Sequence, residues 1–560
     1  MDRKKYLSIW LWLLVILVAV GLRLMFIETP FWYDEACSWA TAIQAFPKGI
    51  LGNLNNVDLQ HTPLYFFILH FWMKIFGDSE ISIRSLSLIF GVATIPMVYF
   101  VANKITTKLN TVLATVLAIV SPLLVFFSVE ARMYPIVVFL VLLSLNFLID
   151  FEQKGDKKSL VKLVITNLLI PYTLVGGIMY NLSLMICYGL YLFDKDKNKF
   201  NAYAQALVAE LVLLVPYFVM ACNYAKLRSL FVIKHEGMFL FSHFVDLIRN
   251  FFSVSLSDNV YWPSSEPYSM TIALLISVII PCVYFVYGYV QGFKNSEGFN
   301  RFLYVLITAV FVEFVVMSFF QVNVFTVRYV LYLLPPMLLL SIMGLSGKLT
   351  TVHLNVFVFL YAIFAIGFDI NYSSRISENK KLAFKVVRLQ ADELKFDSRD
   401  VVIMPFGADA PYYFRDKNAP KVLPFDFHKQ VRNPENPLYY TENQQRLMKT
   451  DKKHQVIYDA VFSNKGFSDN HYEFFIKNVN QVVPSGRYVL IALYSSDAEA
   501  LVHIEDLRKS ITSVQDVKDR CLEIMLKKYL FDIRAYLENE FTLIDVGPRD
   551  NYTYILLQKK

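Results

Sequence analysis

Runs of about 20 apolar residues recur along this chain, and they constrain its fold more than any other feature. A helix of about 20 residues is long enough to cross the hydrocarbon core of a bilayer. The 560 residues are 56% hydrophobic and only 18% charged, whereas a soluble protein of this length keeps more charge on its surface. We therefore expect a polytopic α-helical membrane protein with about 11 spans.

The charged residues and cysteines exclude several classes of function. The net charge of +7 is modest, and the lysines cluster in short loops between apolar runs, which indicates membrane topology rather than nucleic-acid binding. The sequence has no P-loop and no GxGxxG motif, so nothing in it supports nucleotide binding. The five cysteines show neither a CxxC motif nor the spacing of a metal site; they are Cys37, Cys187, Cys222, Cys282 and Cys521.

Lysine and arginine positions predict the orientation of the chain. The sequence "DRKK" precedes the first apolar run, which lacks a cleavage site and is interpreted as a retained span with its N-terminus in the cytoplasm. The first loop, residues 28–62, then lies outside. The basic loops 151–159, 194–199 and 291–301 are predicted to lie inside. The protein is expected in the cell (plasma or inner) membrane.

Counting crossings places a second segment on the same face as the first loop. Three apolar pieces, 63–77, 84–103 and 109–128, separate residue 62 from residue 130. The run 131–150 ends at a loop predicted to lie inside, so residue 130 faces outside, as residue 62 does. The chain must therefore cross the membrane an even number of times between residues 62 and 130. The piece 63–77 is short, at about 22 Å. We interpret that piece as a re-entrant or surface helix, although another pairing stays open. The sequence "VEARMY", residues 129–134, is then outside with "WYDEA".

The C-terminal third has a different composition. We assign residues 1–370 to a transmembrane domain and 371–560 to a soluble α/β domain on the outer face, with the long loop 223–269 also outside. Four apolar stretches of the C-terminal region are typical of strands: "DVVIMPF", "HQVIYDAVF", "RYVLIALYS" and "FTLIDVG". Residues 496–540 are rich in helix-forming residues.

An acidic pair follows the first apolar run, in "ETPFWYDEACSWA". Asp34 and Glu35 are either a solvated loop start or a functional pair, acting as a general base or as a metal ligand at the membrane surface. Trp32, Tyr33 and Trp39 are interpreted as an interfacial anchor for this loop.

Three further segments on the same predicted face carry candidate residues. His61, two residues before Pro63 at a helix entrance, is either incidental there or contacts an anion favoured by the backbone N–H groups. Glu130 and Arg132 begin an apolar helix, where charge is costly unless it is paired or functional. Arg328, followed by Tyr329, enters a later apolar run. This arginine either snorkels to the interface or binds a phosphate.

Together these residues fit one type of reaction, the attack of an acceptor on an activated sugar carried by a lipid phosphate. The acceptor needs a base, the leaving phosphate needs cations, and a polyprenyl tail needs an apolar groove between helices. Water-soluble nucleotide sugars are not expected outside the cell, so a lipid-linked donor suits the predicted face.

In order and spacing, "WYDEA", "HTPLYF", "EARMY" and "RYVLYLLPP" resemble motifs of bacterial GT-C glycosyltransferases. The nearest families in this resemblance are protein O-mannosyltransferases and lipid A aminoarabinose transferases. The resemblance covers roughly residues 1–370. It implies a polyprenyl-phosphate sugar donor, inversion at the anomeric carbon, and an active site on the outer face beneath the first loop.

The resemblance also implies a role for each candidate residue. Asp34 matches the essential acid of the first loop, the base that deprotonates the acceptor, and Glu35 accompanies it. Glu130 matches an acid near the donor sugar. The remaining candidates would hold the donor phosphate: Arg132 and Arg328, with His61 and Tyr329 near it.

Two departures from the family pattern qualify these roles. Thr62 stands where the His-Pro-Pro-Leu motif of the family has proline, which makes the helix entrance less rigid. Asp34 and Glu35 are adjacent rather than alternating as in Asp-x-Asp, so neither a metal nor another cofactor is expected, although some relatives of the wider superfamily use a divalent metal.

Two alternatives stay open at the level of sequence. A transporter or flippase of lipid-linked glycans would carry charges inside several spans and often inverted repeats, whereas this sequence places charges mainly near span ends and shows no repeat. A ligase would use a diphosphate-linked oligosaccharide instead of a monophosphate-linked sugar. The acceptor, a lipid, a cell-surface glycan or a protein, is not specified by the sequence.

Overall fold

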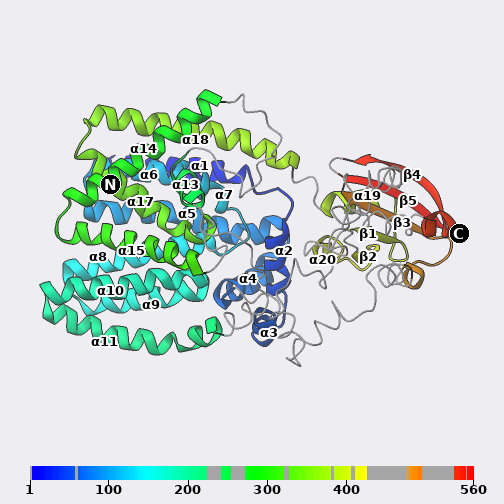
Figure 1. The fold of residues 1–560 in the computed structure, drawn as a ribbon, viewed down its shortest axis with the longest axis horizontal. Helices are drawn as coiled ribbons and strands as arrows, with labels where there is room; N and C mark the ends of the chain where they lie inside the picture. Colours follow the sequence, from blue (N-terminus) through cyan, green and yellow to red (C-terminus); the bar gives the residue numbers. More distant parts are fainter. Residues whose placement is uncertain are drawn as a thin grey trace, which may run out of the picture. The chain divides into compact units, whose positions relative to one another are not determined.

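The computed structural model divides the chain into two compact units, and Figure 1 shows the helices and strands of each. Unit 1 comprises Met1–Thr29, Thr41–Lys226 and His235–Arg375, and unit 2 comprises Pro30–Ala40, Leu227–Lys234 and Ile376–Lys560. The structure describes residues 3–56, 61–222, 241–253, 271–320, 327–379, 384–404, 410–424, 476, 479–494, 535–549 and 552–560. Pro30–Ala40, part of the predicted first loop, thus groups with the C-terminal region.

The described part of the N-terminal two thirds of the chain is mostly helical. Its α-helices up to the first basic loop are α1 (Arg3–Leu24), α2 (Tyr33–Ala42), α3 (Lys48–Asn56), α4 (Pro63–Phe76), α5 (Glu80–Ile105), α6 (Lys108–Val120), α7 (Pro122–Phe127) and α8 (Tyr134–Lys154). They are followed by α9 (Lys157–Thr173), η1 (Val175–Gly177), α10 (Ile178–Lys195), α11 (Lys197–Leu213), α13 (Phe241–Phe252), α14 (Thr271–Asn295), α15 (Gly298–Phe320), α16 (Val327–Val330), η3 (Leu331–Leu333), α17 (Leu334–Ser346) and α18 (Thr351–Asn379). Helices α8 to α11 run side by side in Figure 1.

Several of these helices are suited to crossing a membrane. Within the described residues, six helical segments are long and apolar enough: Glu80–Ile105, Tyr134–Lys154, Val175–Lys195, Gly298–Val316, Val327–Ser346 and Thr351–Ser373. A seventh is formed if Lys197–Leu213 and Val215–Cys222, bent by 47°, are one span. The predicted piece 63–77 is the short helix α4, and the piece 109–128 is broken between α6 and α7 at Ser121. The count of about 11 spans stays a prediction.

Caps and glycines define several helix ends. The Ser79 side chain accepts a hydrogen bond from the Ser82 N–H at the start of α5, and Asp156 caps α9 through the Ser159 N–H. Helix α8 ends at Gly155, whose φ of 66° is a left-handed conformation that favours glycine. Local sequence thus determines where these helices begin and end.

Glycines allow α14 and α17 to pack closely. A Cβ atom on Gly344 would lie 1.8 Å from the Gly288 carbonyl oxygen and 2.6 Å from the Gly292 nitrogen. A Cβ atom on Gly288 would lie 2.4 Å from the Ser341 carbonyl oxygen. Small residues let helix backbones approach each other within a membrane, so this contact depends on the absence of side chains here.

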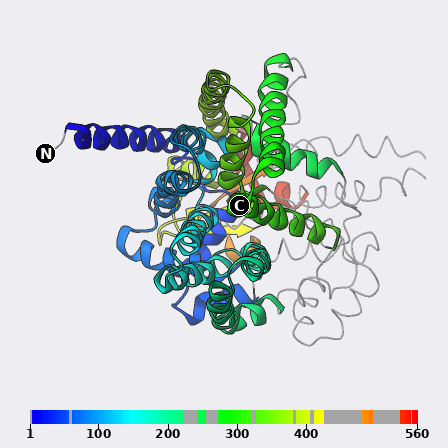
Figure 2. The same ribbon diagram turned by 90° about the vertical axis from the view of Figure 1, so that its left-hand side faces the viewer.

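A buried guanidinium ties the end of α1 to its neighbours. Arg23 is 1% exposed and donates hydrogen bonds to Ser128 Oγ at 3.0 Å and to the Ile119 carbonyl oxygen at 3.2 Å. It also interacts electrostatically with the buried Asp369 of α18. The first turns of α1, by contrast, project from the other helices in Figure 2, and Trp10 is exposed.

A carboxylate lies inside the helical bundle and is held by a neighbouring helix. Glu210 of α11 is buried and accepts a hydrogen bond from Asn181 Nδ2 of α10 at 3.2 Å. Buried charges in membrane helices are costly unless they are paired. Glu210 is therefore an exception to the expectation that charges lie mainly near span ends, and its partner on α10 was not evident from the sequence.

Unit 2 contains a mixed sheet with strands β1 (Val401–Met404), β2 (Lys421–Pro424), β3 (Tyr488–Tyr494), β4 (Phe541–Arg549) and β5 (Tyr552–Lys559). Their order is β2-β1-β3-β5-β4; β1 runs parallel to β2 and β3, and β5 is antiparallel to β3 and β4. Val401 and Ile403 pack on one face, Val402 and Met404 on the other. Helix α19 (Phe384–Glu393) covers the second face through Val387. Burial of both faces explains the continuous apolar run of β1.

The predicted fold class, a polytopic helical protein with a C-terminal α/β domain, is confirmed. The predicted strands "DVVIMPF", "RYVLIALYS" and "FTLIDVG" correspond to β1, β3 and β4. Strands β2 and β5 were not predicted. The predicted strand "HQVIYDAVF", most of the helix-rich segment 496–540 and most of the loop 223–269 lie outside the described residues.

Replacing Gly344 by alanine should separate α14 from α17. The new methyl group meets backbone atoms that cannot rotate away, so we expect a loss of about 1–3 kcal/mol of stability, measured by thermal unfolding of the full chain in detergent micelles. Gly189→Ala in α10 is the matched control, because its Cβ would have no atom within 4 Å and alanine favours a helix. Equal melting temperatures for the two variants would contradict this account of the contact.

Candidate active site

The bend between α7 and α8 carries two charged side chains into the interior of unit 1. Glu130 and Arg132 are both buried. The Arg132 N–H donates to the Glu130 carbonyl oxygen at 2.6 Å, and Ser87 Oγ of α5 donates to the Arg132 carbonyl oxygen at 3.0 Å. Ser128, at the start of the bend, accepts the hydrogen bond from Arg23 described above. The backbone of the bend is thus fixed by two other helices.

The buried guanidinium of Arg132 contacts the entrance of α4. Arg132 Nη2 lies 2.5 Å from Nε2 of the buried His61. Because a guanidinium only donates hydrogen bonds, Nε2 must be the acceptor, so His61 is neutral and carries its proton on Nδ1. Thr62 and Pro63 follow, with the proline in the first turn of α4. The helix entrance and the bend therefore meet at the His61–Arg132 pair.

Arg328 lies in the same region as Glu130 and Arg132. Tyr134, the first residue of α8, interacts electrostatically with Arg132, Glu130, Arg328 and Tyr329. Helix α8 packs against η3, which follows α16 directly. The guanidinium of Arg328 also lies 5.4 Å from the centroid of the Tyr329 ring, a cation–π contact.

Five of the seven predicted site residues are thus brought together in unit 1: His61, Glu130, Arg132, Arg328 and Tyr329. Two guanidinium groups and one carboxylate give the cluster an excess positive charge. The start of α4 adds backbone N–H groups that have no partner within the helix. This arrangement can bind an anion such as a phosphate beside a carboxylate.

The other two predicted residues lie in unit 2, at the start of α2. Glu35 is buried, and its Oε2 accepts a hydrogen bond from the Trp32 N–H at 3.3 Å. This is the N-terminal capping arrangement in which a glutamate at the third helical position reaches back to the N-cap residue. Asp34 is half-buried and lies in the same first turn, where the helix dipole favours negative charge. Glu35 therefore has a local structural contact of its own.

The segment that carries Asp34 packs against a short helix of the C-terminal region, α20 (Ala410–Tyr413). The Phe31 N–H donates to the Tyr413 hydroxyl at 2.8 Å. The rings of Phe31 and Trp39 lie 4.7 Å and 5.2 Å from the Tyr412 ring. Trp39 is 6% exposed, so its prediction as an interfacial anchor is wrong. The side chain of Tyr33 lies outside the described residues.

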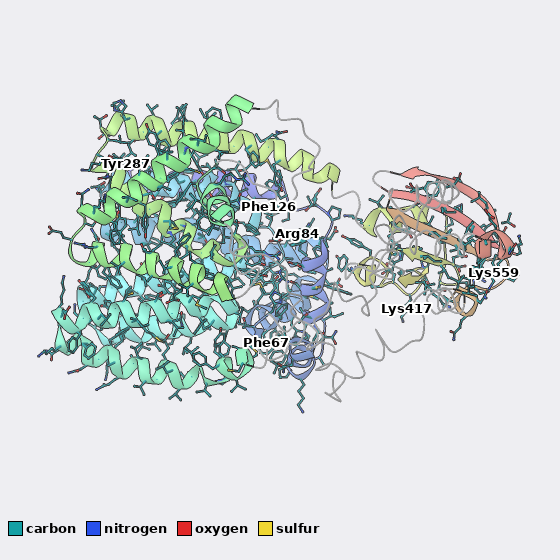
Figure 3. All side chains as sticks on the ribbon, viewed as in Figure 1. Phe67, Arg84, Phe126, Tyr287, Lys417 and Lys559 are labelled. Atoms are coloured by element: carbon teal, nitrogen blue, oxygen red, sulfur yellow. The ribbon has the colours of Figure 1, made fainter. Side chains whose placement is uncertain are left out.

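A residue that sequence analysis missed holds the chain just before this segment. Arg84 of α5, labelled in Figure 3, is buried and donates hydrogen bonds to the carbonyl oxygens of Ile27 and Thr29. The sequence signal was an arginine in the first turns of an apolar helix. Tyr134 was also missed as a site residue, although it belongs to the "EARMY" motif.

Comparisons with known proteins show which family model and which solved folds this chain resembles. Residues 60–219 match the model of the dolichyl-phosphate-mannose-protein mannosyltransferase family. The apo crystal structure of ArnT from Cupriavidus metallidurans matches with a TM-score of 0.55 and 10% identity, covering 98% of each chain. ArnT bound to undecaprenyl phosphate matches with a TM-score of 0.55 and 11% identity, covering 99% of this chain and 98% of that one.

The chain has the fold of the GT-C glycosyltransferases. The predicted resemblance to GT-C enzymes is therefore confirmed. The apo oligosaccharyltransferase of Archaeoglobus fulgidus matches with a TM-score of 0.46 and 12% identity, covering 87% of this chain and 70% of that one. No curated protein sequence matches the chain significantly. His61, Glu130 and Arg132 fall inside the region matched by the mannosyltransferase family model.

Two variants of Glu35 separate its capping contact from a chemical role. Glutamine at this position can still accept the Trp32 N–H, so Glu35→Gln should keep the stability of the chain and, if the carboxylate serves only as a cap, its activity. Glu35→Ala should lose about 0.5–2 kcal/mol, measured by thermal unfolding. Loss of activity in Glu35→Gln at unchanged stability would instead support the predicted catalytic role.

Removing the Tyr413 hydroxyl should loosen the segment that carries Asp34. In Tyr413→Phe the buried Phe31 N–H loses its acceptor, at a cost of about 1–3 kcal/mol. We expect faster amide hydrogen exchange in a peptide covering residues 30–40, measured by mass spectrometry. Tyr488→Phe, at the exposed start of β3, serves as the control and should leave that exchange unchanged. Unchanged exchange in Tyr413→Phe would contradict the contact.

Proposed function

We propose that the chain transfers a sugar from a polyprenyl-phosphate donor to an acceptor on the outer face of the membrane, with inversion at the anomeric carbon. Arg132 and Arg328 hold the donor phosphate, with His61 and Tyr329 beside them. Glu130 lies near the donor sugar. Asp34, accompanied by Glu35, is the base.

The observation that carries the proposal is that Tyr134 interacts with the buried Arg132 and Glu130 and with the half-buried Arg328, all in unit 1. Desolvated guanidinium groups bind phosphate strongly and with defined geometry. Apolar helices around the site suit a lipid carrier. ArnT, whose fold this chain shares, has been crystallised with undecaprenyl phosphate, which supports a lipid phosphate as the ligand.

The proposed step balances without a further reactant. A lone pair on the acceptor hydroxyl oxygen attacks the anomeric carbon, and the bond from that carbon to the phosphate oxygen breaks. The electron pair of this bond leaves with the polyprenyl phosphate, whose new charge is stabilised by Arg132 and Arg328. The Asp34 carboxylate takes the proton of the acceptor hydroxyl. Attack opposite the leaving phosphate inverts the anomeric carbon.

Replacing Asp34 by asparagine tests whether this carboxylate is the base. Asp34→Asn keeps the size of the side chain and removes the base, so turnover should fall by about 10² to 10⁴-fold. Binding of the donor should persist, because the proposed phosphate ligands are unchanged. The assay uses the full chain in membranes with a polyprenyl-phosphate sugar and fractions of lipid, polysaccharide and protein as acceptors.

Glu28→Gln is the matched control, because Glu28 is an exposed acid on the same stretch of chain. It should retain the activity of the natural protein. Full turnover in Asp34→Asn would contradict the role of Asp34. If the natural protein transfers only from a diphosphate-linked oligosaccharide, it is a ligase and the proposal is wrong. If it moves the lipid-linked sugar across the membrane without transferring it, it is a flippase and the proposal is also wrong.

A further inference from the structure

Two buried hydroxyl groups flank the His61–Arg132 pair. The side chain of Tyr134 is fully buried, and its hydroxyl has no hydrogen-bond partner among the residues that the structure describes. The hydroxyl of Thr62 is likewise buried and, within the described residues, has no partner. Buried hydroxyl groups are normally hydrogen-bonded, because leaving one unpaired destabilises the folded protein. Two such groups beside the same arginine and histidine are both available to donate a hydrogen bond to a ligand.

The Tyr134 hydroxyl lies in the field of both site arginines. It interacts electrostatically with Arg132 and Arg328, as well as with Glu130. Its ring packs edge-on against Phe127 at 5.5 Å, which fixes its position. A hydroxyl donor beside two guanidinium groups can share with them only an acceptor, and an anion with several oxygens can accept from all three.

The absence of a capping hydrogen bond from Thr62 supports the same interpretation. It occupies the N-cap position of α4, where threonine normally accepts a hydrogen bond from the backbone of the first turn. Here its side chain makes no capping hydrogen bond. The hydroxyl is therefore available beside His61, at a helix start whose N–H groups also favour an anion.

We propose that the hydroxyl groups of Tyr134 and Thr62 donate hydrogen bonds to phosphate oxygens of the lipid-linked donor. This inference rests on the proposed function and adds two binding residues to it. Neither residue was assigned a role by sequence analysis, and Thr62 stands at the position where the resembled motif has proline. The threonine thus supplies a donor that proline cannot.

The test measures binding of undecaprenyl phosphate to the purified full chain in detergent micelles. Tyr134→Phe and Thr62→Val keep the shape of each side chain. Each should weaken binding about tenfold to a hundredfold, as expected for the loss of a hydrogen bond to a charged group. The melting temperature without ligand should stay equal or rise, because each change removes an unpaired buried hydroxyl.

Tyr180→Phe is the matched control. The Tyr180 hydroxyl is also buried, but it is hydrogen-bonded to Ser144 Oγ at 3.0 Å. Its loss should lower the melting temperature without ligand and leave the affinity for undecaprenyl phosphate unchanged. This pattern is the reverse of that expected for Tyr134→Phe, so a general loss of folding cannot imitate the predicted result.

The outcomes separate this inference from the proposed function. If the natural protein binds undecaprenyl phosphate and Tyr134→Phe or Thr62→Val binds it equally well, that hydroxyl is not a ligand and the inference is wrong for it. If the natural protein does not bind undecaprenyl phosphate, the proposed function itself is contradicted. Inorganic phosphate is titrated in parallel, and binding of inorganic phosphate alone would contradict a lipid-linked ligand.

Discussion

The contact between Arg132 and His61 is the interaction on which the site of unit 1 depends. A guanidinium group buried among apolar helices is costly unless its donors are satisfied. The neutral His61 ring satisfies one of them at 2.5 Å. The bend is fixed through Ser87 and Ser128. These constraints bring the start of α4 and the start of α8 to one place inside the bundle, and η3, which follows Arg328, packs against α8.

The proposed base, Asp34, belongs to unit 2 rather than to unit 1. Asp34 lies on a segment that groups with the C-terminal region and packs on Tyr412 and Tyr413. The C-terminal domain therefore has a structural role that the sequence did not indicate, because it holds the acidic end of α2. If Asp34 is the proposed base, changes in this domain should alter turnover without changing the proposed donor ligands. The residues proposed to bind the phosphate, by contrast, belong to unit 1.

Sequence alone predicted the features that arise from local pattern. Apolar runs indicated the helices, and "RYVLIALYS" indicated β3. Glu130 and Arg132, the charged residues at a helix start, were identified because charge in an apolar helix is costly unless it is paired or functional. Features that depend on distant partners were missed or misjudged. Trp39 was taken for a membrane anchor because its partner Tyr412 is far along the chain, and β5 was missed beside the predicted β3 and β4. Tyr134 became a candidate only when its burial and its neighbours were known.

A structure of the full chain with undecaprenyl phosphate, determined by electron cryomicroscopy in a lipid nanodisc, would show where the phosphate binds. We expect density for the phosphate within hydrogen-bonding distance of Arg132 and Arg328, with the Tyr134 hydroxyl directed at one of its oxygens. The polyprenyl tail should extend between apolar helices of unit 1. Phosphate density elsewhere, with the His61–Arg132 cluster unoccupied, would contradict the assignment of this cluster as the donor site.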